Sequence, residues 1–309
     1  MILCVNLNPC VDKTLFVDEL RRDVIQTASR VSITVGGKAN NVARVLSAFG
    51  REAVAMNFLG GETGRLCRRL LVEEDRVRTE TIWTTAATRE IITIFEEVPG
   101  RHTDIKEPSP LISADEKARF IERYTVLLAD AQMVSFGGSA PSDSVDDLPA
   151  VLLRLARERG VPFILDTYGR AFALGIEQRP FMVKPNASEA GALLGFEVTD
   201  EAAQARALEV LAEKASLAVL SLGEGGFLAA RNGHFWRVGS PQVKTVNAVG
   251  SGDALVAGVI MGLLDGRPFD ETLALAAAAG AANAASPLAC RIGPADVMPL
   301  VASARVCQL

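Results

Sequence analysis

The sequence predicts an α/β protein in which helices cover both faces of a mainly parallel sheet. Short apolar runs typical of strands alternate along the chain with segments whose apolar residues recur at helical spacing. Most of the strand-like runs are continuously apolar, which is typical of strands buried on both faces. Ligands of such sheets bind beyond the carboxyl ends of the strands, so polar motifs at those ends are the candidate functional residues.

The elements follow one another in the order that this fold class requires. The first strand is expected over residues 2–7, before Asn8-Pro9, and the first helix over 37–49, where apolar residues recur at i, i+3, i+4 and i+7. Further strands are expected over 53–58, 131–136, 161–166, 181–183, 217–222, 226–230 and 234–238, the last two joined by an Asn-Gly turn. Further helices are expected over 63–74, 145–159, 188–194, 201–214, 254–264 and 270–285.

Two pairs of segments break this pattern. Residues 14–17 with 30–35, and 78–85 with 90–97, alternate apolar and polar residues and are rich in β-branched types. They are predicted to form a small second sheet with one open face. A few strands cannot bury an apolar face alone, so this face should cover the active site, a partner subunit, or both.

Composition and charge exclude several classes of protein. The chain of 309 residues is 49% hydrophobic and 22% charged, with a formal net charge of -5 and scattered charges, which argues against a nucleic-acid partner. The five cysteines lack C-x-x-C spacing, which argues against a disulfide framework or a zinc site and favours reduced thiols in a cytoplasmic protein. The longest small-apolar stretch, 273–285, is too short to cross a bilayer, so no membrane partner is expected.

The strongest local signal is the stretch Asn-Ala-Val-Gly-Ser-Gly-Asp-Ala at 247–254, which precedes an apolar helix. Gly250 and Gly252 let the backbone turn sharply and present successive amides at the helix N-terminus, a place that binds anions. Asp253, in the first turn, could accept a proton from an attacking hydroxyl. The structural alternative is a glycine turn followed by an acidic residue that the helix dipole favours.

A second glycine-rich stretch, Gly-Gly-Lys-Ala-Asn-Asn-Val-Ala-Arg at 36–44, also leads into a helix. Lys38 supplies a positive charge, and Asn41 could bond sugar hydroxyls; helix capping with a surface charge is the alternative. The stretch is not a P-loop, because Ser32 occupies the position of the required first glycine. Leu255 replaces the last glycine of a dinucleotide fingerprint in the other stretch, which disfavours a dehydrogenase.

Three further positions each allow two interpretations. Asn186 and Glu189, after Lys184-Pro185, have the spacing of a helix capping box, or could orient magnesium-bound water and phosphate. Asp12 could clamp two sugar hydroxyls or be an ordinary turn residue. Arg89 is either a solvated edge charge or a clamp on a phosphate or carboxylate.

Taken together and in this order, these segments resemble the PfkB family of ribokinase-like sugar kinases, from Asn8 to about Asn283. The stretch 246–253, Thr88-Arg89 and the Gly-Gly-Lys form of the first motif are most similar to the branch acting on phosphorylated hexoses. This branch includes 1-phosphofructokinase, tagatose-6-phosphate kinase and the minor 6-phosphofructokinase. The resemblance implies a three-layer α/β/α sandwich, one domain over 1–309, with a small β-sheet lid formed by about 12–35 and 78–108.

The resemblance also implies roles for individual residues. Asp253 would be the catalytic base, and the amides of Gly250, Ser251, Gly252 and Asp253 would form an anion hole. The sugar or its phosphate would be held by Asp12, Gly37, Lys38, Asn41, Arg89 and Ser139. The nucleotide side would comprise Lys184, Asn186, Glu189, Ser221, Gly223, Gly226 and Asn283.

The implied cofactors are ATP and Mg²⁺, with the metal held through ATP and reached by Glu189 through water rather than by direct protein ligands. The implied partners are a sugar phosphate and a second copy of the chain, because family members often dimerise through the lid. Two positions depart from the family pattern. Ala39 replaces a usual glycine, and Gly137-Gly138-Ser139 replaces Ser-Gly-Ser, which puts the role of Ser139 in question. The alternatives are a ribokinase-type kinase of a free sugar or nucleoside, and a non-catalytic nucleotide- or sugar-phosphate-binding regulator.

Overall fold

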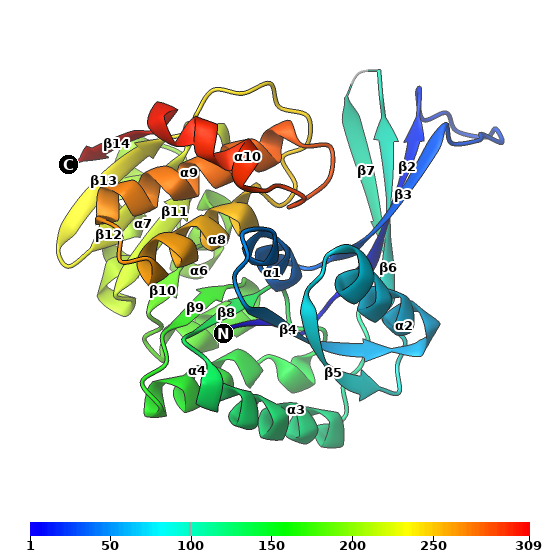
Figure 1. Cartoon of the computed structure of the whole chain (residues 1–309), viewed down its shortest axis with the longest axis horizontal. Helices are drawn as coiled ribbons and strands as arrows, with labels where there is room; N and C mark the ends of the chain where they lie inside the picture. The colour runs from blue at the N-terminus through cyan, green and yellow to red at the C-terminus, as the bar shows by residue number, and fades with distance from the viewer. Residues whose placement is uncertain (99) are drawn as a thin grey trace.

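A ten-stranded sheet forms the centre of the computed structural model, which describes residues 1–98 and 100–309 (Figure 1). Strand β1 (Ile2–Asn6) lies between β4 and β8 and pairs in parallel with both. The strands from β5 to β11 are parallel, and antiparallel strands extend the opposite edge. The order is β14 (Arg305–Gln308), β13 (His234–Gly239), β12 (Phe227–Arg231), β11 (Leu217–Ser221), β10 (Met182–Val183), β9 (Phe163–Asp166), β8 (Met133–Gly137), β1, β4 (Ala53–Gly60) and β5 (Arg78–Thr84).

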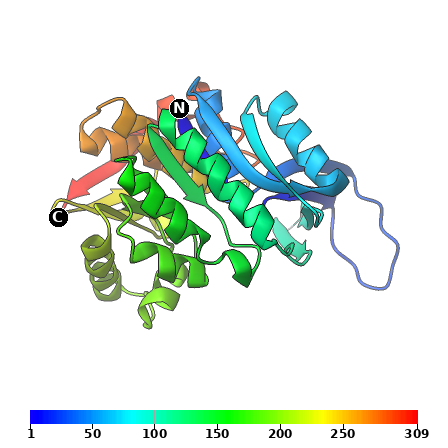
Figure 2. The same cartoon turned by 90° about the horizontal axis from the view of Figure 1, so that it is seen from below.

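Helices cover both faces of this sheet, as the continuously apolar strands predict. Cys4 of β1 belongs to one hydrophobic core, whereas Leu3 and Val5 belong to the core on the other face. The first core includes α1 (Lys38–Ala48), α8 (Ser251–Leu264), α9 (Phe269–Ala285) and α10 (Pro294–Val297). The second includes α3 (Ala114–Leu127), α4 (Leu148–Glu158), α5 (Gly169–Ile176), α6 (Ala187–Leu194) and α7 (Glu201–Lys214), and Figure 2 shows α3 and α4 crossing this face.

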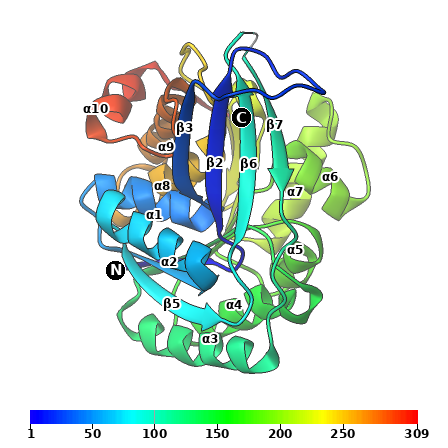
Figure 3. The same ribbon diagram turned by 90° about the vertical axis from the view of Figure 1, so that its right-hand side faces the viewer.

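A separate four-stranded sheet projects from one side of the molecule (Figure 3). Its order is β3 (Arg30–Gly36), β2 (Cys10–Val17), β6 (Arg89–Glu96) and β7 (Arg101–Lys106). Its base packs on α2 (Gly61–Arg69), where Val11 and Val35 share a small core with Cys67. We call this sheet the lid. Because β2 starts shortly after β1 ends, the lid rises directly from the carboxyl edge of the large sheet.

The predicted membership of the small sheet is confirmed in part and corrected in part. The pairing of 14–17 with 30–35 is confirmed, since β2 and β3 are antiparallel. The pairing of 78–85 with 90–97 is wrong: β5 pairs in parallel with β4 at the edge of the large sheet, and β6 pairs with β2 and β7. An edge strand and a lid strand both have a partly open face, so the same alternating pattern fits either place.

The strand and helix order predicted for the rest of the chain is confirmed. Two helices on the second face, α3 and α5, and strands β7 and β14 are additional elements that the pattern did not predict. The start of α3 does carry a recognisable signal, because Ser113 and Glu116 form a capping box. Within the described residues, no helix combines the length and apolar character needed to span a bilayer.

Candidate active site

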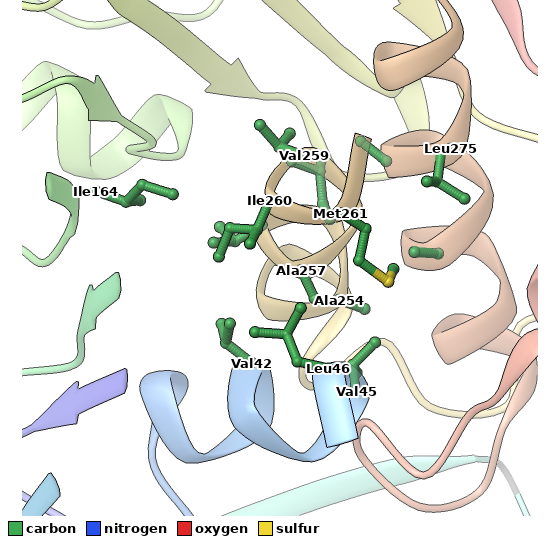
Figure 4. Close-up of a cluster of buried hydrophobic side chains, with 14 of the residues drawn as sticks. Val42, Val45, Leu46, Ile164, Ala254, Ala257, Val259, Ile260, Met261 and Leu275 are labelled. Atoms are coloured by element: carbon green, nitrogen blue, oxygen red, sulfur yellow. The ribbon is translucent and has the colours of Figure 1, made fainter. Parts of the chain in front are cut away.

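The N-termini of α1 and α8 meet beyond the carboxyl ends of the central strands. Figure 4 shows Val42 and Leu46 of α1 facing Ala254 and Ala257 of α8 in the buried core that holds the two helices together. Asp253 of α8 is one residue from this contact and is buried. The packing of two helices therefore fixes the relative position of the side chains that start them.

Charged side chains from four parts of the chain converge at this junction. The Lys38 ammonium lies 2.8 Å from Asp166 Oδ1 and 3.2 Å from Glu189 Oε1. The Lys184 ammonium lies 3.2 Å from the other oxygen of Asp166. Burial lowers the pKa of Lys38, but Asp166, Glu189 and Asp253 outweigh this effect and raise it above its usual value. Lys38 is therefore positively charged at neutral pH.

The carboxyl group of Asp253 has an unusual environment. It is 6% exposed, and its Oδ2 accepts a hydrogen bond of 2.7 Å from Asn41 Nδ2. Burial, and then the negative charge of Asp166, raise the pKa of Asp253 to about 6, while Lys38, Asn41 and Lys184 act in the opposite direction. A carboxylate that titrates near 6 can take a proton from a hydroxyl at neutral pH.

The backbone before α8 forms the predicted glycine turn. Gly250 adopts a left-handed conformation with φ of 88°, and a Cβ at Gly252 would lie 3.1 Å from the Lys184 ammonium. The amides of Ser251 and Asp253 donate to carbonyls of Ala248 and Gly250. Within the described chain, those of Gly250 and Gly252 donate to no protein acceptor. Of the four amides in the predicted anion hole, only those of Gly250 and Gly252 are thus without an acceptor in the described chain.

Asn283 supports this turn from behind. Its side chain is fully buried, donates to Val249 O and Ser251 Oγ at 2.9 Å each, and accepts from the Cys290 amide. All of its polar atoms are therefore used inside the protein. The residue therefore holds the glycine turn in shape, and its place in the nucleotide pocket stays a prediction.

The residues predicted to bind the sugar lie where the lid joins the large sheet. Gly37, with φ of 122°, precedes α1 against the side chain of Asn6, and Asp12 and Arg89 belong to β2 and β6. Ser139 Oγ accepts a hydrogen bond of 3.0 Å from Asn8 Nδ2. Among the described residues, Asp12 Oδ1 and Arg89 Nε are buried polar atoms without a hydrogen-bond partner.

Such unpartnered polar atoms are unfavourable unless a ligand or water satisfies them. Burial, and then the charge of Asp104, raise the pKa of Asp12, whereas Arg44 and Lys106 lower it. The two groups without a partner are an acidic and a basic side chain. They lie on neighbouring strands of the lid, β2 and β6, where Cys10 is opposite Arg89. This arrangement suits a ligand that has both hydroxyl and anionic groups.

The residues predicted to face the nucleotide form a second group. Asn186 and Glu189 make the capping box of α6, so the structural interpretation of their spacing is confirmed. Glu189 is also bonded to Lys38, which connects this box to the charged cluster. Ser221 is the last residue of β11 and forms a β-bridge with Asn186. Gly223 and Gly226 shape the turn that follows, and both have positive φ. A Cβ at Gly226 would clash with the backbone of β13.

The two departures from the family pattern have simple structural explanations. Ala39 is a fully buried residue in the first turn of α1 and does not have the positive φ that would require glycine. Gly137 lets the end of β8 approach α1, since a Cβ there would lie 2.9 Å from Ala39 N. Both substitutions therefore preserve close packing between the sheet and the start of α1.

Asp166 and Arg44 belong to this cluster of side chains but were not predicted from the sequence. Asp166 ends β9 and binds both lysines, and its place at the carboxyl end of a predicted strand was the available signal. Arg44 is 4% exposed and donates to Asn41 Oδ1. A buried arginine gives no distinct signal, because charged residues on a helix usually face solvent.

Comparison with known proteins identifies the family. Residues 5–295 match the pfkB family of carbohydrate kinases. The chain is 35% identical over 288 residues to a tagatose-6-phosphate kinase of Staphylococcus epidermidis, covering 92% of each sequence.

The fold agrees with this match. A possible 1-phosphofructokinase of Thermotoga maritima superposes with a TM-score of 0.90 and 26% identity, covering 100% of this chain and 99% of that one. Phosphofructokinase-2 of Escherichia coli, in its tetrameric inhibited form, has a TM-score of 0.89 at 24% identity over 98% of both chains, a likeness of fold. The chain belongs to the PfkB family of carbohydrate kinases and has its ribokinase-like fold.

Proposed function

We propose that the protein transfers the γ-phosphoryl group of ATP to a hydroxyl of a phosphorylated ketohexose, with Asp253 as the base. The acceptors that fit this proposal are fructose 1-phosphate, tagatose 6-phosphate and fructose 6-phosphate, and the product is the bisphosphate. The observation that carries it is the buried Asp253 carboxyl, with a pKa of about 6, next to two free amides and two lysines. The relative from Staphylococcus epidermidis supports a hexose phosphate as acceptor.

The residues fit a nucleotide with its metal. Lys184, beside Gly252, and the free amides of Gly250 and Gly252 would hold the phosphates of ATP. Together with Mg²⁺, they would neutralise the negative charge that develops on the transferring phosphoryl group. Asp166 and Glu189 are already bonded to lysines. Glu189 would therefore reach the metal through water, which suits a cation that keeps several of its waters.

On the acceptor side, Asp12 would accept bonds from sugar hydroxyls, and Arg89 would donate to the phosphate of the substrate. Both have buried polar atoms that lack a partner among the described residues. Asn41 would keep the base oriented while the acceptor hydroxyl lies near the free oxygen of Asp253. Positioning and charge stabilisation would supply most of the rate increase, because the loose transition state needs little covalent work from the protein.

The test is a comparison of kcat/KM for the three hexose phosphates, free fructose and ribose with Mg-ATP. The phosphorylated sugars should be preferred by roughly two orders of magnitude or more, because charge-assisted bonds contribute about 1.5–3 kcal/mol each. In Arg89→Met this preference should shrink roughly tenfold or more, with kcat/KM for free sugars little changed.

Two results would contradict parts of the proposal. Equal use of ribose or free fructose would favour a ribokinase-type enzyme, which needs Asp253 but not Arg89. The absence of ADP release with every acceptor would favour a non-catalytic binding protein. An active Asp253→Asn variant would remove Asp253 as base, since general-base contributions are roughly 10² to 10⁴-fold.

A further inference from the structure

We propose that Arg44, paired with Asp75, is a positioning residue for the base, because it fixes which end of the Asn41 carboxamide faces Asp253. This inference rests on the proposed function, in which Asp253 takes the proton. Arg44 would act on Asp253 through Asn41. Its guanidinium group donates to Asn41 Oδ1 and to the carbonyl oxygens of Val35 and Ala289, and its charge also lowers the pKa of Asp12.

The geometry of Arg44 allows only one orientation of Asn41. Arg44 Nη1 donates to Asn41 Oδ1 at 2.6 Å, and Nη2 donates to Val35 O at 2.8 Å. A guanidinium group has donors and no acceptor, so it can face only the oxygen of a carboxamide. The amide nitrogen of Asn41 is then left for Asp253, and the two atoms are 2.7 Å apart.

The opposite orientation of the Asn41 carboxamide would occupy the same space but exchange the positions of its oxygen and its nitrogen. It would place the amide oxygen against the Asp253 carboxylate, where two acceptors repel each other. In the observed orientation, the N–H bond stabilises the ionised carboxyl and opposes the burial that raises its pKa to about 6. The other titratable or charged groups that face Asp253 come from α1, β9, the end of β10 and the loop after α9: Lys38, Asp166, Lys184 and Cys290.

Asp75 makes a buried arginine possible at this point. Its Oδ2 lies 2.8 Å from Arg44 Nε in an ion pair whose side chains are 2% and 4% exposed. Its Oδ1 lies 3.3 Å from Arg291, which pairs with Glu74 nearer the surface. A buried arginine without such a partner would be strongly unfavourable. The pair therefore keeps Arg44 directed at Asn41, three residues earlier on the same face of α1.

The decisive variant replaces the whole ion pair by apolar side chains, Arg44→Met with Asp75→Leu, which buried pairs often tolerate without loss of stability. Asn41 can then rotate, and the acid limb of kcat/KM should move upward by about one pH unit. At a pH below the acid limb, kcat/KM of the variant should be about tenfold lower than that of the wild type, with little difference between the two at pH 8.5. Arg44→Lys keeps a side chain that can donate but not accept a hydrogen bond, so the pH of its acid limb should stay nearer to that of the wild type.

A control removes a different ion pair near α1. Arg51, shortly after the end of α1, pairs with Asp265 at the C-terminal cap of α8, away from the site, so Arg51→Met with Asp265→Leu should leave the limb in place. A limb at the wild-type pH in the folded Arg44→Met/Asp75→Leu variant overturns the proposal. If that variant does not fold, Arg44→Gln, which can present either a donor or an acceptor, should also raise the limb, and an unmoved limb counts equally against it.

A measurement without substrate separates this inference from the proposed function. Titration of the Asp253 carboxyl by ¹³C NMR should show a higher pKa in the apolar pair variant than in the wild type and the control. If the wild type phosphorylates no acceptor, the proposed function fails while this titration still decides whether Arg44 positions Asn41. An equal pKa in all three proteins would refute the positioning role.

Discussion

At the level of single residues, the properties of Asp253 result from opposing effects. Burial and the nearby Asp166 favour its neutral form, whereas Lys38, Asn41 and Lys184 favour its ionised form. The balance leaves a carboxyl group that is mostly ionised at pH 7 and still more basic than an exposed aspartate. Two predictions follow from this balance, one for activity and one for stability.

The pH dependence of activity should reflect this carboxyl group. We expect kcat/KM to fall as the pH drops through about 6, because a protonated Asp253 cannot accept the proton of the acceptor hydroxyl. The measurement is a pH–rate profile at saturating Mg-ATP with limiting hexose phosphate. A profile that stays flat down to pH 4.5 would contradict the proposed state of Asp253.

Asp253 should also lower the stability of the protein at neutral pH. Its pKa in the fold, about 6, exceeds the ordinary value of 3.8, so the folded state binds the proton more tightly. The stability therefore decreases as the pH rises from about 4 through 6, where the buried group loses its proton. Asp253→Asn should raise the free energy of unfolding at pH 8 by on the order of 2 kcal/mol and abolish turnover.

Urea unfolding at pH 8 and at pH 4.5 measures this effect, and the gain should shrink at the lower pH. Asp265→Asn is the matched control, because this residue lies at the other end of α8 in a partly exposed ion pair. The control should be neutral or slightly destabilising. A loss of stability in Asp253→Asn at pH 8 would show that the charge of Asp253 is favourable in the fold.

At the level of elements, the close approach of α8 to α9 keeps Asp253 in place. Glycines on α8 face the neighbouring helix, and a Cβ at Gly258 would lie 2.6 Å from Ala276 Cα. A Cβ at Gly262 would lie 2.6 Å from Thr272 Oγ1. The predicted alanine-rich helix therefore has a reason for its composition: small side chains allow the two backbones to pack at short range.

Gly258→Ala should be destabilising, although alanine ordinarily stabilises a helix interior relative to glycine by about 1 kcal/mol. Here the added methyl group meets backbone atoms, and overpacking of this kind costs about 1–3 kcal/mol. The melting temperature and kcat should both decrease, because α8 carries the proposed base. Gly293→Ala, where the new Cβ would meet no atom within 4 Å, is the control. An unchanged melting temperature in Gly258→Ala would disprove the close contact.

The elements differ in how well the sequence specifies them. The buried strands and the helix at 37–49 were predictable because apolar residues at a fixed period leave few alternatives. The place of β5 was not predictable. Its alternating apolar and polar residues indicate that one face of the strand is open, but they do not indicate which sheet the strand joins. Helix α5 begins at a glycine with positive φ and is only 8 residues long, so its apolar pattern is too short to be distinctive.

At the level of the whole molecule, the lid has an apolar face that the rest of the described chain covers only near its base. Strand register places Ile33 of β3 opposite Lys13, and Ile105 of β7 opposite Ile92. Near its base this face packs on α2, but farther out Val31, Ile33 and Ile105 are 49%, 41% and 57% exposed. Asp12 and its neighbours occupy the opposite face, as the period of two requires. We expect a second copy of the chain to cover the apolar face.

Ile33→Glu should therefore shift the protein toward a monomer, because it would place a charge in the centre of this contact. Light scattering after size-exclusion chromatography measures the change. Val72→Glu, at another exposed apolar position outside the lid, is the control and should not alter the mass. A wild-type protein that is monomeric at micromolar concentration would contradict the lid contact.

The site was predictable to the extent that local sequence determines it. The glycine turn before Asp253 and the capping box at Asn186 depend on neighbouring residues and were recognised. The bonds of Asp166 to two lysines, and of Arg44 to Asn41 and Asp75, join distant parts of the chain, and only the folded structure brings them together. The same is true of Asn283, whose buried position behind the turn has no local signature.

The central position of β1 also affects how the chain assembles during synthesis. This strand precedes all others, yet one of its two partners is β8, which starts at Met133. While the intervening segment is being made, an extended apolar segment has one edge without a partner, and such edges pair readily with other chains. The ribosome-bound intermediate should thus depend on chaperones until β8 emerges, and slow translation between residues 60 and 133 would prolong its exposure to aggregation.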